Sequence, residues 1–104
     1  MRSTLDLSKV EGLEWDKGNL EHIRKHNVGY RECEESFLNK PLVINKDETH
    51  SQAEERFRVY GKTNKDRSLF LIFTLRSNKI RVITARDQNN KERKEFKKIG
   101  GEYQ

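Results

Sequence analysis

The chain has 104 residues, which suits one compact domain. Charged residues make up 38% of the sequence and hydrophobic residues 32%, so the core must be small, and the net charge of +5 favours an anionic partner such as nucleic acid or an acidic protein. The single cysteine excludes an intrachain disulfide and a cysteine-based zinc site, and the lack of a signal peptide or of an apolar run near the ~20 residues of a membrane span predicts a soluble, cytoplasmic protein.

Two helices are predicted in the first half of the chain. Residues 1–9 are expected to form a flexible leader, and residues 10–15 have the pattern of a short strand. Asp16 is a suitable N-cap for a helix over 17–26, and a second helix is predicted over 30–39. The apolar side of the second helix is expected to consist of Tyr30, Cys33, Phe37 and Leu38.

Strand patterns dominate the second half of the chain. They cover residues 42–46, 55–62, 68–76 and 79–86. The second of these strands alternates, with Phe57 and Val59 on one face and Arg56, Arg58 and Tyr60 on the other. The third strand is apolar on both faces, as expected of a central strand.

A helix over residues 89–99 is predicted to follow the strands. We therefore expect an α+β fold with N-terminal helices, an antiparallel sheet of about four strands (between three and five) and a C-terminal helix. The single domain would cover residues 10–99, and residues 100–104 would form a tail.

Arginines are spread over the predicted strands, at Arg56, Arg58, Arg67, Arg76, Arg81 and Arg86. Side chains on one face of neighbouring strands come within reach of each other, and the planar guanidinium group suits phosphate. The alternative is that these arginines form cross-strand ion pairs with Glu54, Glu55 or Asp87. A regular strand would point Arg81 and Arg86 to opposite faces, unless a bulge intervenes or Arg86 lies beyond the strand end.

Lys25 and His26 close the first predicted helix. Cations at a helix C-terminus are favoured by the macrodipole, but either residue could also transfer protons or bind phosphate. His22 and His26 are one helical turn apart, the spacing of a metal-binding pair. Because no carboxylate completes such a motif, we expect no metal site.

Carboxylates gather on the second predicted helix, at Glu32, Glu34 and Glu35. Such a run is typical of a solvated face, although one of them could lie near the arginines as a general base or an orienting group. The chain has no glycine-rich phosphate loop, no G-x-S-x-G motif and no Cys/His arrangement of known spacing. Nucleotide hydrolysis and acyl transfer therefore have no support.

Five stretches form a distinctive set: LEWDKGNLEHIRKHNV, ECEESF, HSQAEERFRVYGKT, DRSLFLIFTLRSNKIRVITARD and NKERKEF. Together, over residues 13–96, they resemble the BrnT family of type II toxin–antitoxin systems. The resemblance implies a RelE-like fold and a small toxin that cleaves RNA without a metal or other cofactor and inhibits translation. It also implies a BrnA-like antitoxin that silences the toxin, with promoter DNA bound only through the antitoxin complex.

The resemblance also indicates site residues. The family's active-site lysine falls on Lys25, beside His26, and its acidic residue falls on Glu32 or Glu34. Its basic strand residues fall on Arg67, Arg81 and Arg86, with Glu55 and Arg56 as further candidates.

Two departures from the family pattern stand out. Asn27 occupies a position where the family often has glycine, and asparagine tolerates the same left-handed turn. Phe96 occupies a position where many relatives carry a tyrosine, so this side chain supplies no phenol.

We therefore expect a metal-independent ribonuclease toxin. Lys25, His26 or the glutamate of the second helix would transfer protons. The phosphate would be held, and the transition state stabilised, by Arg67, Arg81 and Arg86. Further RNA contacts are expected from Arg56, Arg58 and Arg76, and Trp15 or Tyr60 could stack a base. The alternative is a non-catalytic basic module that binds nucleic acid or protein, or a structural partner in a larger complex.

Overall fold

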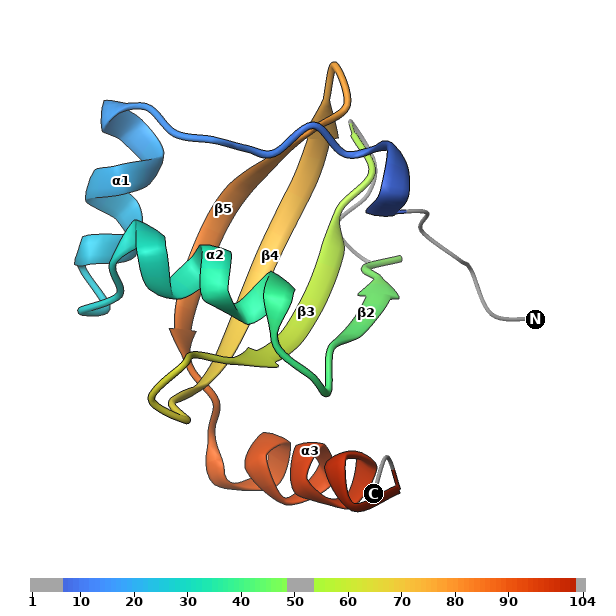
Figure 1. Ribbon diagram of the computed structural model, residues 1–104. Helices are drawn as coiled ribbons and strands as arrows, with labels where there is room; N and C mark the ends of the chain where they lie inside the picture. The colour runs from blue at the N-terminus through green and yellow to red at the C-terminus, as the bar shows by residue number, and fades with distance from the viewer. Residues whose placement is uncertain (1–6, 49–53, 103–104) are drawn as a thin grey trace.

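The computed structural model describes residues 7–48 and 54–102 (Figure 1). Its elements are the 3₁₀ helix η1 (Leu7–Lys9), β1 (Leu13–Glu14), α1 (Lys17–Arg24), α2 (Tyr30–Leu38), β2 (Val43–Lys46), β3 (Phe57–Lys62), β4 (Ser68–Arg76), β5 (Lys79–Asp87) and α3 (Asn90–Glu102). Residues 1–6 of the predicted leader and 103–104 of the predicted tail lie outside the described residues. No helix in the described part of the chain is long and apolar enough to span a membrane.

The strands form one sheet in the order β1-β5-β4-β3-β2. Strands β2 to β5 pair antiparallel, as predicted, and the short β1 adds a parallel strand beside β5, with Leu13 opposite Ile80. The predicted α+β class with a C-terminal helix is therefore confirmed. Figure 1 shows α2 in front of the sheet, α1 to the left of β5, and α3 beyond the lower end of the sheet.

The hydrophobic core lies between the sheet and the first two helices. Its buried members are Ile23, Val28, Cys33, Phe57, Val59, Leu69, Leu71, Phe73, Ile80, Val82 and Ala85. The ring of Phe73 lies 5.5 Å from that of Phe37 on α2 and 5.1 Å from that of Phe57 on β3, measured between centroids. Alternation along the strands thus directs one set of side chains to α2 and leaves the other set on the opposite face of the sheet.

Helix α1 begins at the predicted N-cap. Asp16 Oδ1 accepts a hydrogen bond from the Asn19 backbone N–H at 3.0 Å, and Asn19 Oδ1 accepts one from the Asp16 N–H at 2.8 Å. This capping box satisfies N–H groups that have no partner inside the helix. The helix ends at Arg24 rather than at residue 26, because a turn follows in which Asn27 has the left-handed φ of 59°.

The predicted apolar side of α2 is partly wrong. Tyr30 is 42% exposed and Leu38 is 82% exposed, whereas Ser36 is fully buried beside Cys33. Ser36 lies against Gly61 of β3, where a Cβ atom would come within 2.8 Å of the Ser36 carbonyl oxygen. The glycine allows α2 to approach the sheet so closely that only a small side chain fits on this side of the helix.

A β-bulge divides β5. Ile72 of β4 lies opposite Thr84, but the next residue, Phe73, lies opposite Val82, so that Ile83 is an extra residue on β5. Because of the extra residue, Arg81 and Arg86 point to the same face of the sheet: Arg81 lies opposite Thr74, and Arg86 lies opposite Phe70. Of the alternatives left open by the sequence, the bulge is the one that the structure contains, and both arginines lie on the same face.

Candidate functional site

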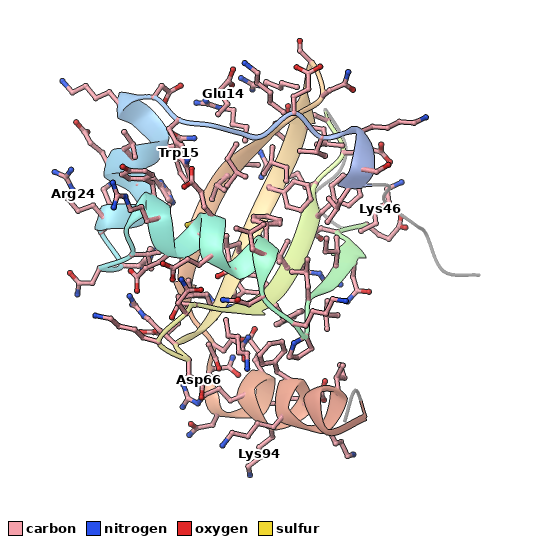
Figure 2. All side chains as sticks on the ribbon, viewed as in Figure 1. Glu14, Trp15, Arg24, Lys46, Asp66 and Lys94 are labelled. Atoms are coloured by element: carbon pink, nitrogen blue, oxygen red, sulfur yellow. The ribbon has the colours of Figure 1, made fainter. Side chains whose placement is uncertain are left out.

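The residues singled out in the sequence fall mainly into two groups. The first group lies on the sheet face opposite α1 and α2, and we call it the arginine face: Arg58, Arg76, Arg81 and Arg86. The second group lies where the α1–α2 turn meets the end of β5, and we call it the Arg67 corner: Lys25, His26, Glu32, Arg67 and Asp87. Figure 2 shows Glu14, the neighbour of Arg81, at the opposite end of the molecule from Asp66, which precedes Arg67.

Arg86 is held on the arginine face by α3. Its Nη1 and Nη2 atoms lie 2.8 and 3.2 Å from the two carboxylate oxygens of Glu92, and Nη1 also donates to the Asp87 carbonyl at 3.0 Å. The guanidinium carbon lies 4.2 Å from the centroid of the Phe70 ring. The hydrogen bonds to Arg86 lower the pKa of Glu92, so this ion pair is present at neutral pH.

Arg81 is held at the other end of β5. Its Nη1 lies 2.7 Å from Asp16 Oδ2 and 3.5 Å from Glu14 Oε1. The hydrogen bond from Arg81 lowers the pKa of Asp16, whose other oxygen caps α1. Arg81 therefore ties the start of α1 to the sheet while remaining on the arginine face.

The remaining strand arginines differ in their contacts. Arg76 Nη2 lies 3.7 Å from Glu54 Oε2, and Glu55 instead pairs with Lys46 at 3.2 Å. The side chain of Arg58 is exposed and makes no hydrogen bond or ion pair with the residues that the structure describes. Arg56 precedes β3 and is half-buried, and its carbonyl accepts from the Asp47 N–H at 2.7 Å.

The Arg67 corner is built around one guanidinium group. Arg67 donates to Asp87 through Nε at 2.7 Å and Nη2 at 3.2 Å, and through Nη1 to both oxygens of Glu32 at 3.0 and 3.1 Å. It also donates to the carbonyls of Asn27 at 2.8 Å and His26 at 3.5 Å. These hydrogen bonds raise the pKa of Arg67 and lower that of Asp87. One side chain thus joins both helices to the ends of β4 and β5.

Two cross-strand pairs predicted as the alternative to phosphate binding are present. Arg67 pairs with Asp87 and Arg76 pairs with Glu54, and only the predicted partner Glu55 has a different cation. Arg76 keeps an exposed side chain while it is paired, whereas the donors of Arg67 are engaged by Asp87, Glu32 and the α1–α2 turn.

Lys25 and His26 have exposed side chains at the corner. The backbone N–H of Lys25 caps α1 by donating to the carbonyls of His22 and Ile23. The rings of His22 and His26 lie 6.4 Å apart, and within the described residues no cluster of three or more His, Cys, Asp and Glu side chains could hold a metal ion. The turn that carries Lys25 and His26 is fixed by Arg67 through the backbone, which leaves both side chains available.

The two candidate glutamates of α2 point to different places. Glu32 Oε1 accepts from the Gly29 N–H at 3.0 Å as well as from Arg67, so it closes the first turn of α2 and joins the corner. Glu34 Oε2 accepts from the Trp15 indole N–H at 3.1 Å. Trp15 also makes an edge contact with Tyr30, at a centroid distance of 6.1 Å, so the indole is a packing residue of this helix pair.

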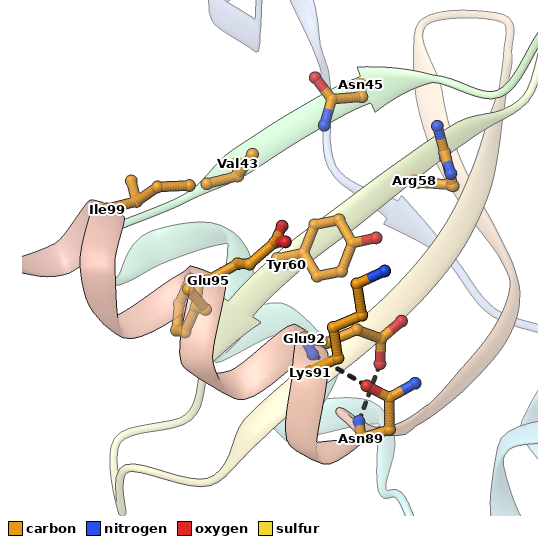
Figure 3. Close-up of a pocket in the computed structure, with 10 residues that line it drawn as sticks. Val43, Asn45, Arg58, Tyr60, Asn89, Lys91, Glu92, Glu95 and Ile99 are labelled. Carbon is orange, nitrogen blue, oxygen red and sulfur yellow. Dashed lines mark hydrogen bonds between the residues drawn. The ribbon is translucent and has the colours of Figure 1, made fainter.

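A cavity of about 390 Å³ lies between α3 and the arginine face (Figure 3). It is lined by Val43, Asn45, Arg58, Tyr60, Asn89, Lys91, Glu92, Glu95, Phe96 and Ile99. Burial, together with the nearby charge of Glu92, raises the pKa of the Tyr60 hydroxyl, which therefore stays protonated. The cavity continues the arginine face at the lower end of the sheet.

The sequence did not indicate Glu92, Lys91 or Glu95 as site residues. A signal for the first of these was present, because Asn89 and Glu92 have the spacing of a capping box, and each accepts from the other's backbone N–H at 2.8 Å. That spacing places Glu92 one turn after β5, close to Arg86. The position of α3 at the end of the sheet depends on tertiary packing and had no such local signal.

The arrangement is suited to binding a polyanion and transferring protons beside it. A family model described as the ribonuclease toxin BrnT of type II toxin–antitoxin systems matches residues 15–92, which include every predicted site residue. The class is thus that of ribonuclease toxins from type II toxin–antitoxin systems, and the chain belongs to the BrnT family. A comparison with curated proteins finds no match.

Proposed function

We propose that the protein is a metal-independent endoribonuclease that binds RNA across the arginine face and inhibits translation by cleaving it. The observation that supports this most directly is the bulge at Ile83, which places Arg81 and Arg86 on the same open face. Arg58 and Arg76 lie on that face as well. Four arginines on one open sheet face suit a flexible, polyanionic strand.

The arginines of this face retain donors for phosphate despite their ion pairs. Among the described contacts, Arg81 donates through Nη1 to Asp16 and Glu14, and Arg86 donates through Nη1 and Nη2. Further N–H groups of both arginines therefore remain for RNA in this part of the structure. No residue of the described chain engages the guanidinium group of Arg58. The carboxylates that hold Arg81 and Arg86 fix their positions before RNA arrives, which reduces the entropy lost on binding.

We assign proton transfer to the exposed pair at the Arg67 corner. His26 accepts the proton of a ribose 2′-hydroxyl, whose oxygen attacks the adjacent phosphorus, and the ammonium group of Lys25 gives a proton to the departing 5′-oxygen. The products are a 2′,3′-cyclic phosphate and a 5′-hydroxyl. Arg86, next to the Asp87 carbonyl at the same end of β5, stabilises the charge that develops on the phosphate.

Glu32 and Arg67 act as positioning residues in this scheme. Arg67 donates hydrogen bonds to both oxygens of Glu32, to Asp87 and to the turn that carries His26. Their contribution is to fix that turn against the end of the sheet. Glu34 supports Trp15 and lies outside the scheme.

Neutralisation of the toxin would come from the antitoxin of the system. We propose that a BrnA-like antitoxin in the cytoplasm lays acidic residues over the arginine face, since this face carries the charge that RNA needs. Promoter DNA would then be bound through the antitoxin in the complex. The chain's net charge of +5 supports an acidic partner for the free toxin.

Induced expression in a bacterial host tests the proposal. We expect growth arrest with loss of intact cellular RNA, and we expect His26→Ala or Arg86→Ala to restore growth at equal levels of soluble protein. Lys94→Ala is a control, because this exposed residue of α3 points away from the sheet in Figure 2. Normal growth and intact RNA with soluble wild-type protein would contradict a ribonuclease toxin.

The ion pairs of the arginine face also favour a second function, that of a non-catalytic binding module. Arg76, Arg81 and Arg86 each have a carboxylate partner, as in a surface built for recognition rather than chemistry. Tight binding of RNA that stays intact would support this second function.

A further inference from the structure

The cavity beside α3 has two chemically different ends. Figure 3 shows the Tyr60 ring between the carboxylate of Glu95 on one side and the cations Arg58 and Lys91 on the other. Apolar side chains, including Val43 and Ile99, line the end near Glu95. A volume of about 390 Å³ is within the range of pockets that hold one small molecule.

Charged side chains at both ends of the cavity have no partner within the described structure. Among the residues that the structure describes, the side chains of Arg58, Lys91 and Glu95 make no hydrogen bond or ion pair, whereas the carboxylate of Glu92 in the same cavity binds Arg86. Charges that face a cavity without a protein partner are available to a ligand. The ligand must therefore bring an anionic group to Arg58 and Lys91, and hydrogen-bond donors to Glu95.

The Tyr60 ring is held in place between these ends. It packs on Phe70 with ring centroids 5.3 Å apart, and Phe70 in turn lies under the Arg86 guanidinium. A ring fixed in this way offers a flat apolar surface to a base at little cost in side-chain entropy. Stacking on such a ring is the usual way in which proteins hold an unpaired base.

We infer that this cavity binds one unpaired guanine nucleotide of the RNA, an inference that rests on the proposed function. The ionised carboxylate of Glu95 only accepts hydrogen bonds, and it has two oxygens side by side. Guanine presents two neighbouring donors, N1–H and N2–H, on its Watson–Crick edge, whereas adenine, cytosine and uracil each present a single donor there next to an acceptor. The base stacks on Tyr60, and Arg58 and Lys91 bind its phosphate.

Two ion pairs, joined by a hydrogen bond to a backbone carbonyl, connect the cavity with the Arg67 corner. Glu92 lines the cavity and binds Arg86, Arg86 donates to the Asp87 carbonyl, and the Asp87 carboxylate binds Arg67. The cavity and the corner are thus linked through the end of β5, one on each face of the sheet. We expect a strand with guanine in the cavity to bring a neighbouring phosphate to that end, so that the cavity would set the site of cleavage.

Nucleotide titrations test the inference without requiring cleavage. We would titrate ¹⁵N-labelled full-length protein with 5′-GMP, 5′-AMP, 5′-CMP and 5′-UMP and follow amide shifts. We expect GMP to bind about tenfold more tightly than the others, with shifts in α3 and β3, as a bidentate contact predicts. Glu95→Gln should abolish the preference for GMP. Lys91→Gln should weaken the binding of all four nucleotides, with GMP still bound most tightly.

Glu21→Gln on α1 is the matched control and should keep both affinity and preference, because this residue is exposed and outside the cavity. Equal affinities for the four nucleotides, or a GMP preference that survives Glu95→Gln, would overturn the inference. So would shifts at the cavity with an acidic antitoxin peptide but with none of the nucleotides.

The inference and the proposed function fail in different ways. A GMP preference in a protein that leaves RNA intact would contradict the proposed ribonuclease activity and support the guanine site. The opposite result is RNA cleavage at positions that show no guanine preference and that do not change in Glu95→Gln. It would contradict the guanine site and support the proposed ribonuclease activity.

Discussion

Arg67 shows how a predicted phosphate ligand can serve as structure instead. Its donors reach two carboxylates and two backbone carbonyls from three separate parts of the chain. A lysine could not replace it, because a single ammonium group lacks the planar fork that engages Asp87 and Glu32 together. The side chains with no internal partner in the described structure, such as Lys25 and Arg58, are better placed to contact a ligand.

The Arg67–Asp87 pair makes the stability of the corner depend on pH. Asp87→Asn should lower the free energy of unfolding by about 1 kcal/mol at neutral pH, a modest value because solvent screens this half-exposed pair. Arg67 lowers the pKa of Asp87 in the folded state, so the carboxylate stabilises the fold above its unfolded pKa of about 4 and loses that effect as the pH falls through the folded value.

Urea denaturation of both proteins from pH 7 down to pH 2 measures this difference. The two unfolding free energies should converge in acid. A constant difference across the whole range would show that the asparagine acts through packing rather than through the charge of Asp87.

At the scale of elements, the sequence predicted the strands better than their pairing. The segment 68–76 is observed as predicted, because a central strand buried on both sides has a strong local pattern. The bulge at Ile83 was only one of two possibilities, since β-branched residues on either side fit a regular strand equally well. Lys25 and His26 were predicted as the last residues of a helix over 17–26, but α1 ends at Arg24 and both residues lie in the turn that follows it. The contact of Arg86 with Glu92 depends on how α3 packs at the end of the sheet.

The contact between α2 and β3 depends on one glycine. Gly61→Ala should lower the free energy of unfolding by about 1–3 kcal/mol, because the added Cβ would lie 2.8 Å from a backbone oxygen of Ser36 that cannot move alone. Thermal and denaturant unfolding measure the loss.

Gly100→Ala provides the opposite case. This glycine is inside α3, and its Cβ would meet Pro41 Cγ at an ordinary 3.4 Å, so alanine should stabilise the helix by about 0.5–1 kcal/mol. If both substitutions changed the free energy of unfolding in the same direction, close packing at Gly61 would not explain the effect of Gly61→Ala.

The molecule as a whole has two unlike sides, with the first two helices packed over one face of the sheet and arginines on the other. Figure 1 shows α2 in front of the sheet and α3 beyond its lower end, and the strand register places the arginines on the face away from α2. The charge of this face predicts a strong dependence of RNA affinity on salt, because each phosphate that a cation neutralises releases condensed counterions.

Removing one phosphate contact should therefore lower the affinity for RNA and also make that affinity depend less steeply on salt concentration. For single-stranded RNA, Arg58→Gln should reduce the slope of log K against log salt concentration by about 0.7. Lys94→Gln on the far side of α3 should leave the slope unchanged. Equal slopes for Arg58→Gln and the wild type would place RNA elsewhere on the molecule.

The most direct test of the central claim is cleavage of a defined RNA by purified protein in excess EDTA, with the product ends identified. We expect cleavage that yields 2′,3′-cyclic phosphate and 5′-hydroxyl ends, slowed by about 10²–10³ in Arg86→Ala and by about 10²–10⁴ in His26→Ala. Cleavage that stops in EDTA, or that proceeds unchanged in both variants, would contradict a metal-independent reaction at the end of β5.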